Sequence, residues 1–112
     1  MVKISSKIRK DMRNYIGEIN NICPIEKVII FGSYASGHQS SDSDIDLAIF
    51  SKNINDDNRL EFMKIFFMKI SKYKLDIQPL AFSFNEFIDG DNDFILNEIK
   101  SKGIEIYSRE QT

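Results

Sequence analysis

The stretch from Phe31 to Phe50, FGSYASGHQSSDSDIDLAIF, decides the fold of this chain. It begins at the end of an apolar, β-branched run, KVIIFG at 27–32, and closes with a second apolar run, DIDLAIF at 44–50. Short runs of this kind, bounded by glycine, proline and serine, are typical of buried strands. We therefore predict two strands joined by a loop rich in glycine and serine, and we expect the later part of the second strand to be buried on both faces.

Two carboxylates stand at the start of the second predicted strand. Side chains two residues apart on a strand share a face, so Asp44 and Asp46 project together while Ile45 and Leu47 face the other way. Two neighbouring carboxylates repel each other unless a cation holds them. Hard oxygen donors at this spacing suit Mg²⁺ or Mn²⁺, so the pair is a candidate metal site.

Gly32 and Ser33 lie where the first strand ends and the chain turns. We expect a short helical turn to follow over residues 34–36. Free backbone N–H groups at such a turn, together with a serine hydroxyl, bind phosphate oxygens, and glycine lets the backbone approach closely. A phosphate-binding turn beside a divalent-metal site implies phosphoryl chemistry.

A third acid lies in the third predicted strand, YKLDIQPLAF at 73–82, where Pro79 indicates a sheet edge or a bulge. Asp76 stands between Leu75 and Ile77, and a core position is unfavourable for a carboxylate unless it completes the same site. Three carboxylates of this kind hold two metal ions that clamp the entering and leaving oxygens of an in-line displacement.

Helices alternate with these strands along the chain. Apolar residues at three- and four-residue steps predict an amphipathic helix over residues 5–21, which Pro24 ends. A second helix is expected to begin at Asp56 or Asp57 and to run to about Ser71. The remaining expected elements are a short helix opened by Ser83 and Glu86, a helix capped by Asp91 that ends before Gly103, and a last strand, GIEIYS at 103–108. This order predicts an α/β or α+β domain.

Composition excludes several classes of protein. The 112 residues carry 15 Lys and Arg against 17 Asp and Glu, and a formal charge of −2 disfavours strong nonspecific nucleic-acid binding. The N-terminus lacks the apolar core of a signal peptide, and no apolar window approaches the length of a membrane span, so we expect neither export nor membrane insertion. One cysteine and one histidine exclude an internal disulfide and a Cys/His zinc cage, which favours the cytoplasm. We expect one domain over residues 1–112.

The combination of Gly32-Ser33, the acids Asp44 and Asp46, and a later Asp76 resembles the nucleotidyltransferase superfamily that includes DNA polymerase β. It is most similar to the minimal nucleotidyltransferase (MNT) branch, and the resemblance covers most of the chain. The resemblance implies the polymerase β-like nucleotidyltransferase fold, a small mixed β-sheet flanked by helices.

The same resemblance implies a metal-dependent activity. Asp44 and Asp46 would bind two Mg²⁺ ions, with Mn²⁺ as the alternative metal, and Asp76 would bind the catalytic ion and assist deprotonation of an attacking hydroxyl. Gly32 and Ser33 would bind the phosphates of ATP or another NTP. The reaction would move a nucleoside monophosphate, most simply AMP from ATP, to an acceptor hydroxyl and release pyrophosphate.

MNT proteins are often paired with a small helical HEPN protein in toxin–antitoxin modules, and some adenylylate a tyrosine of that toxin. The predicted elements leave no second domain to bind an acceptor, so the resemblance implies that a protein partner presents it. A homodimer is the other assembly we consider. The alternative function is an MNT-type antitoxin with weak or no catalysis that neutralises a HEPN partner by binding. A two-metal nuclease is a third reading, which leaves the Gly-Ser turn unexplained.

Four residues near these motifs need separate interpretation. Many relatives carry Arg or Lys beside the Gly-Ser pair or just before the following glycine, where this chain has Tyr34 and Ser36. Asp42 continues the two-residue ladder of acids, and we interpret it as the solvated mouth of the strand. His38 is interpreted as an exposed loop residue, with nucleotide contact as the minority reading.

The helix expected near residues 56–71 is more apolar than a sheet-covering helix needs to be. We expect one face to consist of Leu60, Met63, Phe67 and Ile70. A surplus of four apolar residues is then either buried under the C-terminal helices or exposed as a docking or dimer surface. That surplus consists of Phe62, Ile65, Phe66 and Met68.

Overall fold

The computed structural model describes residues 5–36, 44–73 and 75–109. Four strands form one mixed sheet in the order β3-β2-β1-β4, with β1 antiparallel to β2 and β4, and β2 parallel to β3. The expected small mixed sheet is therefore confirmed. The strands are β1 (Lys27–Phe31), β2 (Ile45–Ser51), β3 (Ile77–Ser83) and β4 (Ile104–Ser108).

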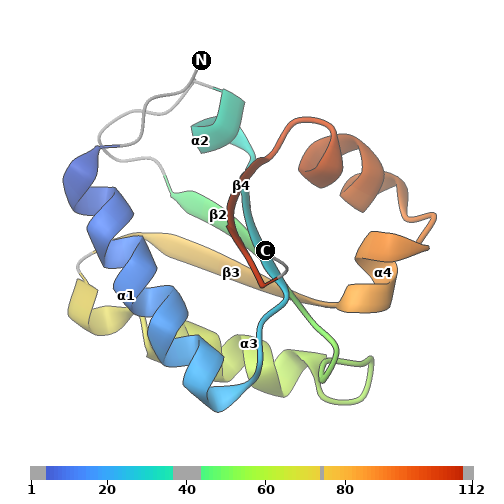
Figure 1. The fold of residues 1–112 in the computed structure, drawn as a ribbon, viewed down its shortest axis with the longest axis horizontal. Helices are drawn as coiled ribbons and strands as arrows, with labels where there is room; N and C mark the ends of the chain where they lie inside the picture. The colour runs from blue at the N-terminus through green and yellow to red at the C-terminus, as the bar shows by residue number, and fades with distance from the viewer. Residues whose placement is uncertain (1–4, 37–43, 74, 110–112) are drawn as a thin grey trace.

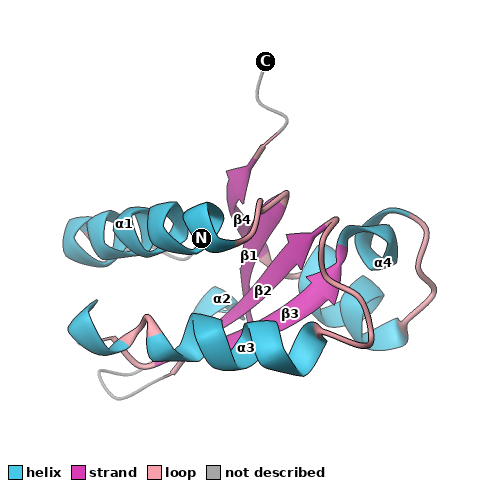
Figure 2. Cartoon of the chain, turned by 90° about the horizontal axis from the view of Figure 1, so that it is seen from below, coloured by secondary structure: helices cyan, strands magenta, loops and turns pink. Residues whose placement is uncertain are grey.

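Helices cover both faces of this sheet, as Figure 1 shows. In both Figure 1 and Figure 2, α1 and α4 lie on opposite sides of the strands. No helix in the described ranges is long and apolar enough to cross a membrane. The helices are α1 (Ser6–Ile22), α2 (Ser33–Ser36), α3 (Arg59–Met68), the 3₁₀ turn η1 (Ser71–Tyr73), α4 (Phe84–Ile88) and the π-helix η2 (Ile95–Lys100).

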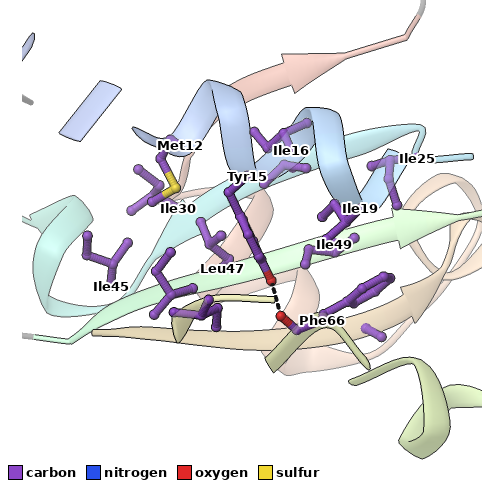
Figure 3. Packing of buried hydrophobic residues seen from close by; sticks show 14 of the residues in the cluster. Met12, Tyr15, Ile16, Ile19, Ile25, Ile30, Ile45, Leu47, Ile49 and Phe66 are labelled. Atoms are coloured by element: carbon purple, nitrogen blue, oxygen red, sulfur yellow. Dashed lines mark hydrogen bonds between the residues drawn. The ribbon is translucent and has the colours of Figure 1, made fainter. Parts of the chain in front are cut away.

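The larger of two apolar cores lies between the sheet and the helices α1 and α3 (Figure 3). Tyr15 and Ile19 of α1 are fully buried against Leu47 and Ile49 of β2. The Tyr15 hydroxyl donates a hydrogen bond of 2.7 Å to the backbone carbonyl of Phe66 in α3. This bond satisfies a buried polar group and ties the two helices together.

The second core lies on the opposite sheet face, under α4 and η2. Phe50 of β2 stacks on Phe82 of β3 with ring centroids 5.4 Å apart, and Ile95 and Ile99 of η2 are buried beside them. Because β2 supplies Leu47 and Ile49 to one core and Ala48 and Phe50 to the other, its later part is buried on both faces. The expectation for this strand is confirmed.

Local signals placed most element boundaries, with two errors at helix starts. Ser83 caps α4 by accepting a hydrogen bond from the backbone N–H of Glu86, as expected. The helix α3 begins after Asn58 rather than after Asp56 or Asp57, since the Asn55 side chain accepts from the N–H groups of Asp57 and Asn58 and holds them in a turn. The last helical segment is capped by Asn92, whose side chain accepts from Ile95 N–H, and the prediction of Asp91 is wrong.

The predicted core face of α3 is right only in part, since Ile70 is buried and Met63 packs against the larger core as expected. Phe66 is fully buried and Phe62 packs against the same core, so these members of the expected docking surface belong to the interior. Leu60 and Phe67, which we expected on the core face, are 76% and 58% exposed. Apolar residues surround this helix, so periodicity left the buried side undetermined. The helix packs beside α1 and not under the C-terminal helices.

We predict that Tyr15→Phe lowers the free energy of unfolding by about 1–2 kcal/mol, because a buried hydrogen bond to the Phe66 carbonyl is lost. Urea denaturation measures the change. Tyr73→Phe is the matched control, since it removes only the partly exposed hydrogen bond from Tyr73 to Glu18 and should cost less. Equal losses in the two variants would contradict the link between α1 and α3.

Candidate active site

Gly32 closes β1 and turns the chain into α2. Its φ of 77° lies in the left-handed region that favours glycine. A Cβ atom added at Gly32 would overlap Oδ2 of Asp46, far inside van der Waals contact. Position 32 therefore needs glycine for its backbone conformation and for the close approach of a carboxylate, and the Gly-Ser turn lies directly against the acids of β2.

Asp44 and Asp46 stand at the start of β2. Asp44 is exposed, whereas Asp46 is half-buried on the sheet face that carries Ala48 and Phe50 further along the strand. Burial raises the pKa of Asp46 above its usual value, and the negative charge of Asp44 raises the pKa further. Both effects penalise the charged form, so a cation at this pair would relieve both.

Asp76 immediately precedes β3, at the same end of the sheet. The backbone N–H of Ile45 donates a hydrogen bond of 2.7 Å to the Asp76 carbonyl, and the parallel register then pairs Ile45 with Ile77 and Asp46 with Gln78. By strand alternation, Asp76 stands on the sheet face of Asp46. Its side chain is exposed, so the prediction that Asp76 is buried inside a strand is wrong. The strand begins one residue later, at the buried Ile77, so Asp76 lies just outside the strand at its solvent-exposed end.

The acids offer hard oxygen donors, which suit a divalent cation such as Mg²⁺. Asp44 and Asp46 fit such an ion best, because their charges interact and Asp46 is partly desolvated. Across residues 5–36, 44–73 and 75–109, no three His, Cys, Asp or Glu side chains are close enough to hold a metal ion together. Asp76 therefore lies at the same end and on the same face of the sheet as Asp44 and Asp46. It does not form a three-residue cluster with them.

The loop between β1 and β2 carried several sequence predictions. Ser33 is the first residue of α2, next to Gly32. Tyr34 is buried in the larger core, so it is a packing residue. His38 and Asp42 lie outside the described residues.

Sequence reasoning missed a pocket of about 380 Å³ that shares Gly32 with the turn. One wall of the pocket comes from the end of β1, with Phe31, and the other from the segment around η2, with Phe94. These two segments are more than 60 residues apart in the chain. The one local signal was an exposed aromatic residue in a polar loop, DNDF at 91–94. The residues that line the pocket are Phe31, Gly32, Phe94, Glu98 and Lys102.

Comparison with known protein families gives one match that spans most of the chain. Residues 14–112 match the sequence model of the family described as "Polymerase beta, Nucleotidyltransferase". The match contains the Gly-Ser turn and all three acids. No curated protein matches this chain.

Solved structures of similar fold include a candidate nucleotidyltransferase from Sulfolobus solfataricus, with a TM-score of 0.60, 23% identity, and coverage of 99% of this chain and 95% of that one. A chain of a toxin–antitoxin crystal structure with AMP-PNP has a TM-score of 0.60, 18% identity, and coverage of 92% and 75%. A chain of the tri-AMPylated Shewanella oneidensis HEPN toxin in complex with MNT antitoxin has a TM-score of 0.52, 16% identity, and coverage of 89% and 72%. At these identities the similarity establishes a common fold.

Proposed function

This chain belongs to the polymerase β nucleotidyltransferase family, and on that premise we propose that it transfers AMP from ATP to a hydroxyl group of a partner protein. The observation that carries the proposal is the contact between the Gly-Ser turn and Asp46. A glycine with positive φ, whose missing side chain makes room for a carboxylate, brings a phosphate-binding turn and a metal-binding acid into one site.

The residues at the start of α2 would bind the triphosphate. Gly32 leaves the backbone open to the phosphate oxygens, and the N–H groups that follow it precede the first helical hydrogen bond of the turn, from Ala35 N–H to the Gly32 carbonyl. Tyr34 and Ala35 are buried in the larger core and anchor this short helix. The turn is thereby held rigidly while its N-terminal side faces the acids.

Asp44 and Asp46 would hold Mg²⁺, and Asp76 would face the acceptor. When bound, the metal neutralises phosphate charge and polarises the phosphorus that is attacked. Asp46 is kept in place by the ladder between β1 and β2, in which it pairs with Phe31. Asp76 is exposed at the mouth of the site, where an incoming hydroxyl can reach it.

The proposed step is an in-line displacement at the α-phosphorus of ATP. The acceptor oxygen forms a bond to this phosphorus, and the bond from the phosphorus to the oxygen bridging to the β-phosphate breaks. Pyrophosphate leaves with that electron pair, and Asp76 accepts the proton of the acceptor hydroxyl. The partner keeps an adenylyl group.

The direct test incubates the purified chain with Mg²⁺, ATP labelled at the α-phosphate, and the protein encoded beside it. The expected result is label on the partner, a mass increase equal to AMP, and one pyrophosphate per AMP added. The same reaction with ATP labelled at the γ-phosphate should leave the partner unlabelled. Label transfer from the γ-phosphate, or release of nucleotides from an added polymer, would refute the proposal.

A second candidate function is neutralisation of a HEPN partner by binding, with little or no catalysis. It is favoured by the exposed apolar side chains of α3, Leu60, Phe67 and Met68, since exposed patches of this kind mark interfaces. The two functions share the docking step and differ in the nucleotide. Neutralisation that proceeds equally well without ATP would favour the second.

We predict that Phe67→Ser combined with Met68→Ser weakens partner binding by at least about tenfold and leaves ATP binding unchanged. These side chains are 58% and 66% exposed, so their loss removes docking area and not core packing. Sedimentation of the chain, alone and with the partner, measures both heteromeric binding and self-association. The control variant Ile88→Ser removes an apolar side chain of similar exposure, 54%, from α4. Equal weakening by this control would contradict the placement of the surface on α3.

A further inference from the structure

The pocket beside Gly32 has one aromatic wall and one polar wall. We call it the Phe94 pocket, lined by Phe31, Gly32, Phe94, Glu98 and Lys102. Its volume of about 380 Å³ lies in the range of small-molecule sites. A pocket of this size next to a phosphate-binding turn has room for a part of the nucleotide beyond the phosphates.

The aromatic wall is formed by two phenylalanines in an edge-to-face arrangement. The rings of Phe31 and Phe94 have centroids 5.5 Å apart and planes at 89°. Phe31 is buried, whereas Phe94 is 44% exposed. Phe31 therefore supports the ring of Phe94 from behind, and part of Phe94 remains open to a flat ligand.

The pocket lies on the same sheet face as the acids, one strand away. Phe31 pairs directly with Asp46 across the antiparallel ladder, and directly opposed residues project from the same face. Gly32 lines the pocket, and its missing Cβ would overlap the Asp46 carboxylate. Gly32 thus adjoins both the Asp46 carboxylate and the Phe94 pocket.

The polar wall offers one acceptor and one donor. Glu98 and Lys102 lie one helical turn apart with an N–O distance of 3.3 Å, and both side chains are largely open to solvent. A carboxylate accepts hydrogen bonds from an amino group and repels a carbonyl oxygen. Because the Lys102 ammonium pairs with one Glu98 oxygen, Glu98 can use its other oxygen to accept from an amino group at the edge of an aromatic ligand.

The segment carrying Glu98 has a rare backbone conformation. η2 is a π-helix, and the Ser101 N–H reaches back five residues to the Leu96 carbonyl at 3.2 Å. Such segments occur frequently at functional sites. Here it places Glu98 on the pocket while Ile95 and Ile99 of the same segment stay buried in the smaller core.

We infer that the Phe94 pocket binds the nucleobase, with the open ring of Phe94 stacking on the base and Glu98 accepting from its exocyclic amino group. This inference rests on the proposed function, since it takes the Gly-Ser turn as the site of the phosphates. The inference predicts that the protein prefers ATP to ITP, in which a carbonyl oxygen replaces the exocyclic amino group.

The test measures binding of Mg-ATP and of inorganic triphosphate with Mg²⁺ by titration calorimetry. Phe94→Leu keeps an apolar side chain of similar size but has no ring, whereas Phe94→Tyr keeps the ring. We expect Phe94→Leu to weaken ATP binding by about five- to a hundredfold, with triphosphate binding unchanged, because base stacking on an aromatic ring is worth about that ratio. Phe94→Tyr should retain ATP affinity. The control Phe67→Leu changes an exposed ring on the opposite face of the sheet and should have no effect.

The outcomes separate this inference from the function on which it rests. If wild-type protein binds triphosphate and Phe94→Leu binds ATP with wild-type affinity, the base lies elsewhere and the proposed function stands. Equal weakening of ATP and triphosphate by Phe94→Leu also overturns the inference, since Phe94 would then act on the turn. If wild-type protein binds neither ligand, the proposed function itself fails.

The role of Glu98 is tested by the ratio of ATP to ITP affinity. Wild-type protein should prefer ATP, and Glu98→Gln should reduce that preference, because an amide both accepts and donates hydrogen bonds. A Glu98→Gln variant with an unchanged ratio would overturn the role of Glu98. Lys102→Gln is the matched control at the other end of the ion pair and should change the ratio less.

Discussion

Replacing Asp46 by Asn should abolish nucleotidyl transfer while the chain remains folded. Asn keeps the size of the side chain and removes the charge that would hold Mg²⁺ at the phosphates. A bound metal contributes several kcal/mol to the stabilisation of transition-state charge, so we expect a loss of about a thousandfold or more in rate. Pyrophosphate release in the presence of Mg²⁺, ATP and the partner measures it.

The stability of Asp46→Asn provides an independent readout without metal. Burial and the neighbouring Asp44 raise the pKa of Asp46, so the folded protein binds its proton more tightly than the unfolded chain does. The wild type therefore loses stability as the pH rises from the usual aspartate range through the raised pKa, whereas Asn does not titrate. In EDTA at neutral pH the variant should have the higher Tm, and the difference should vanish at low pH.

The control for these measurements is Asp57→Asn, at an exposed acid in the turn before α3. It should leave both the transfer rate and the pH profile of Tm unchanged. A strong drop in the Tm of Asp46→Asn in EDTA would show that Asp46 stabilises the fold, which contradicts the repulsion argument.

Gly32→Val should eliminate detectable binding of Mg-ATP. The backbone at position 32 has a φ of 77°, which a β-branched residue adopts only with strain, and the new Cβ would displace the Asp46 carboxylate. A side chain at position 32 would also obstruct the approach of the phosphates to the backbone. The structure adds that it collides with the acid, so the turn and the metal site fail together. Titration calorimetry measures the binding, and denaturation should show a loss of about 1–3 kcal/mol.

Gly17→Ala is the matched control for Gly32→Val. Gly17 lies within α1, and a Cβ added there has no heavy atom within 4 Å. Alanine should therefore stabilise the helix by about 0.5–1 kcal/mol and leave ATP binding unchanged. Retention of ATP binding in Gly32→Val would place the phosphates away from the turn.

Local pattern was sufficient for the strands around the Gly-Ser loop and for the shared face of Asp44 and Asp46. Alternation along an extended chain depends only on backbone geometry, so two residues of spacing specify a common face. Pro24, Ser83 and the apolar run at 27–31 act on their own neighbourhood in the same way, and the boundaries that depend on them agree with the structure.

Pairings between distant segments were not contained in any local pattern. Asp76 stands beside the start of β2 because β2 and β3 pair in parallel, with Ile45 opposite Ile77, and a single-residue change of register would move the acid to the other face. The buried side of α3 was likewise decided by contact, since Tyr15 of α1 reaches the Phe66 carbonyl and draws that side of an evenly apolar helix into the core.

The Phe94 pocket depends entirely on contacts between segments that are distant in the sequence. The sequence identifies Phe31 as the last residue of a predicted strand and Phe94 as an aromatic residue after an acidic loop. The residues around each of them give no signal that the two side chains are in contact. They meet because η2 buries Ile95 and Ile99 against the sheet face opposite to α1, which sets Phe94 over the end of β1. Backbone periodicity thus fixes where each side chain points along its own element, whereas burial of apolar surface between elements determines which side chains meet.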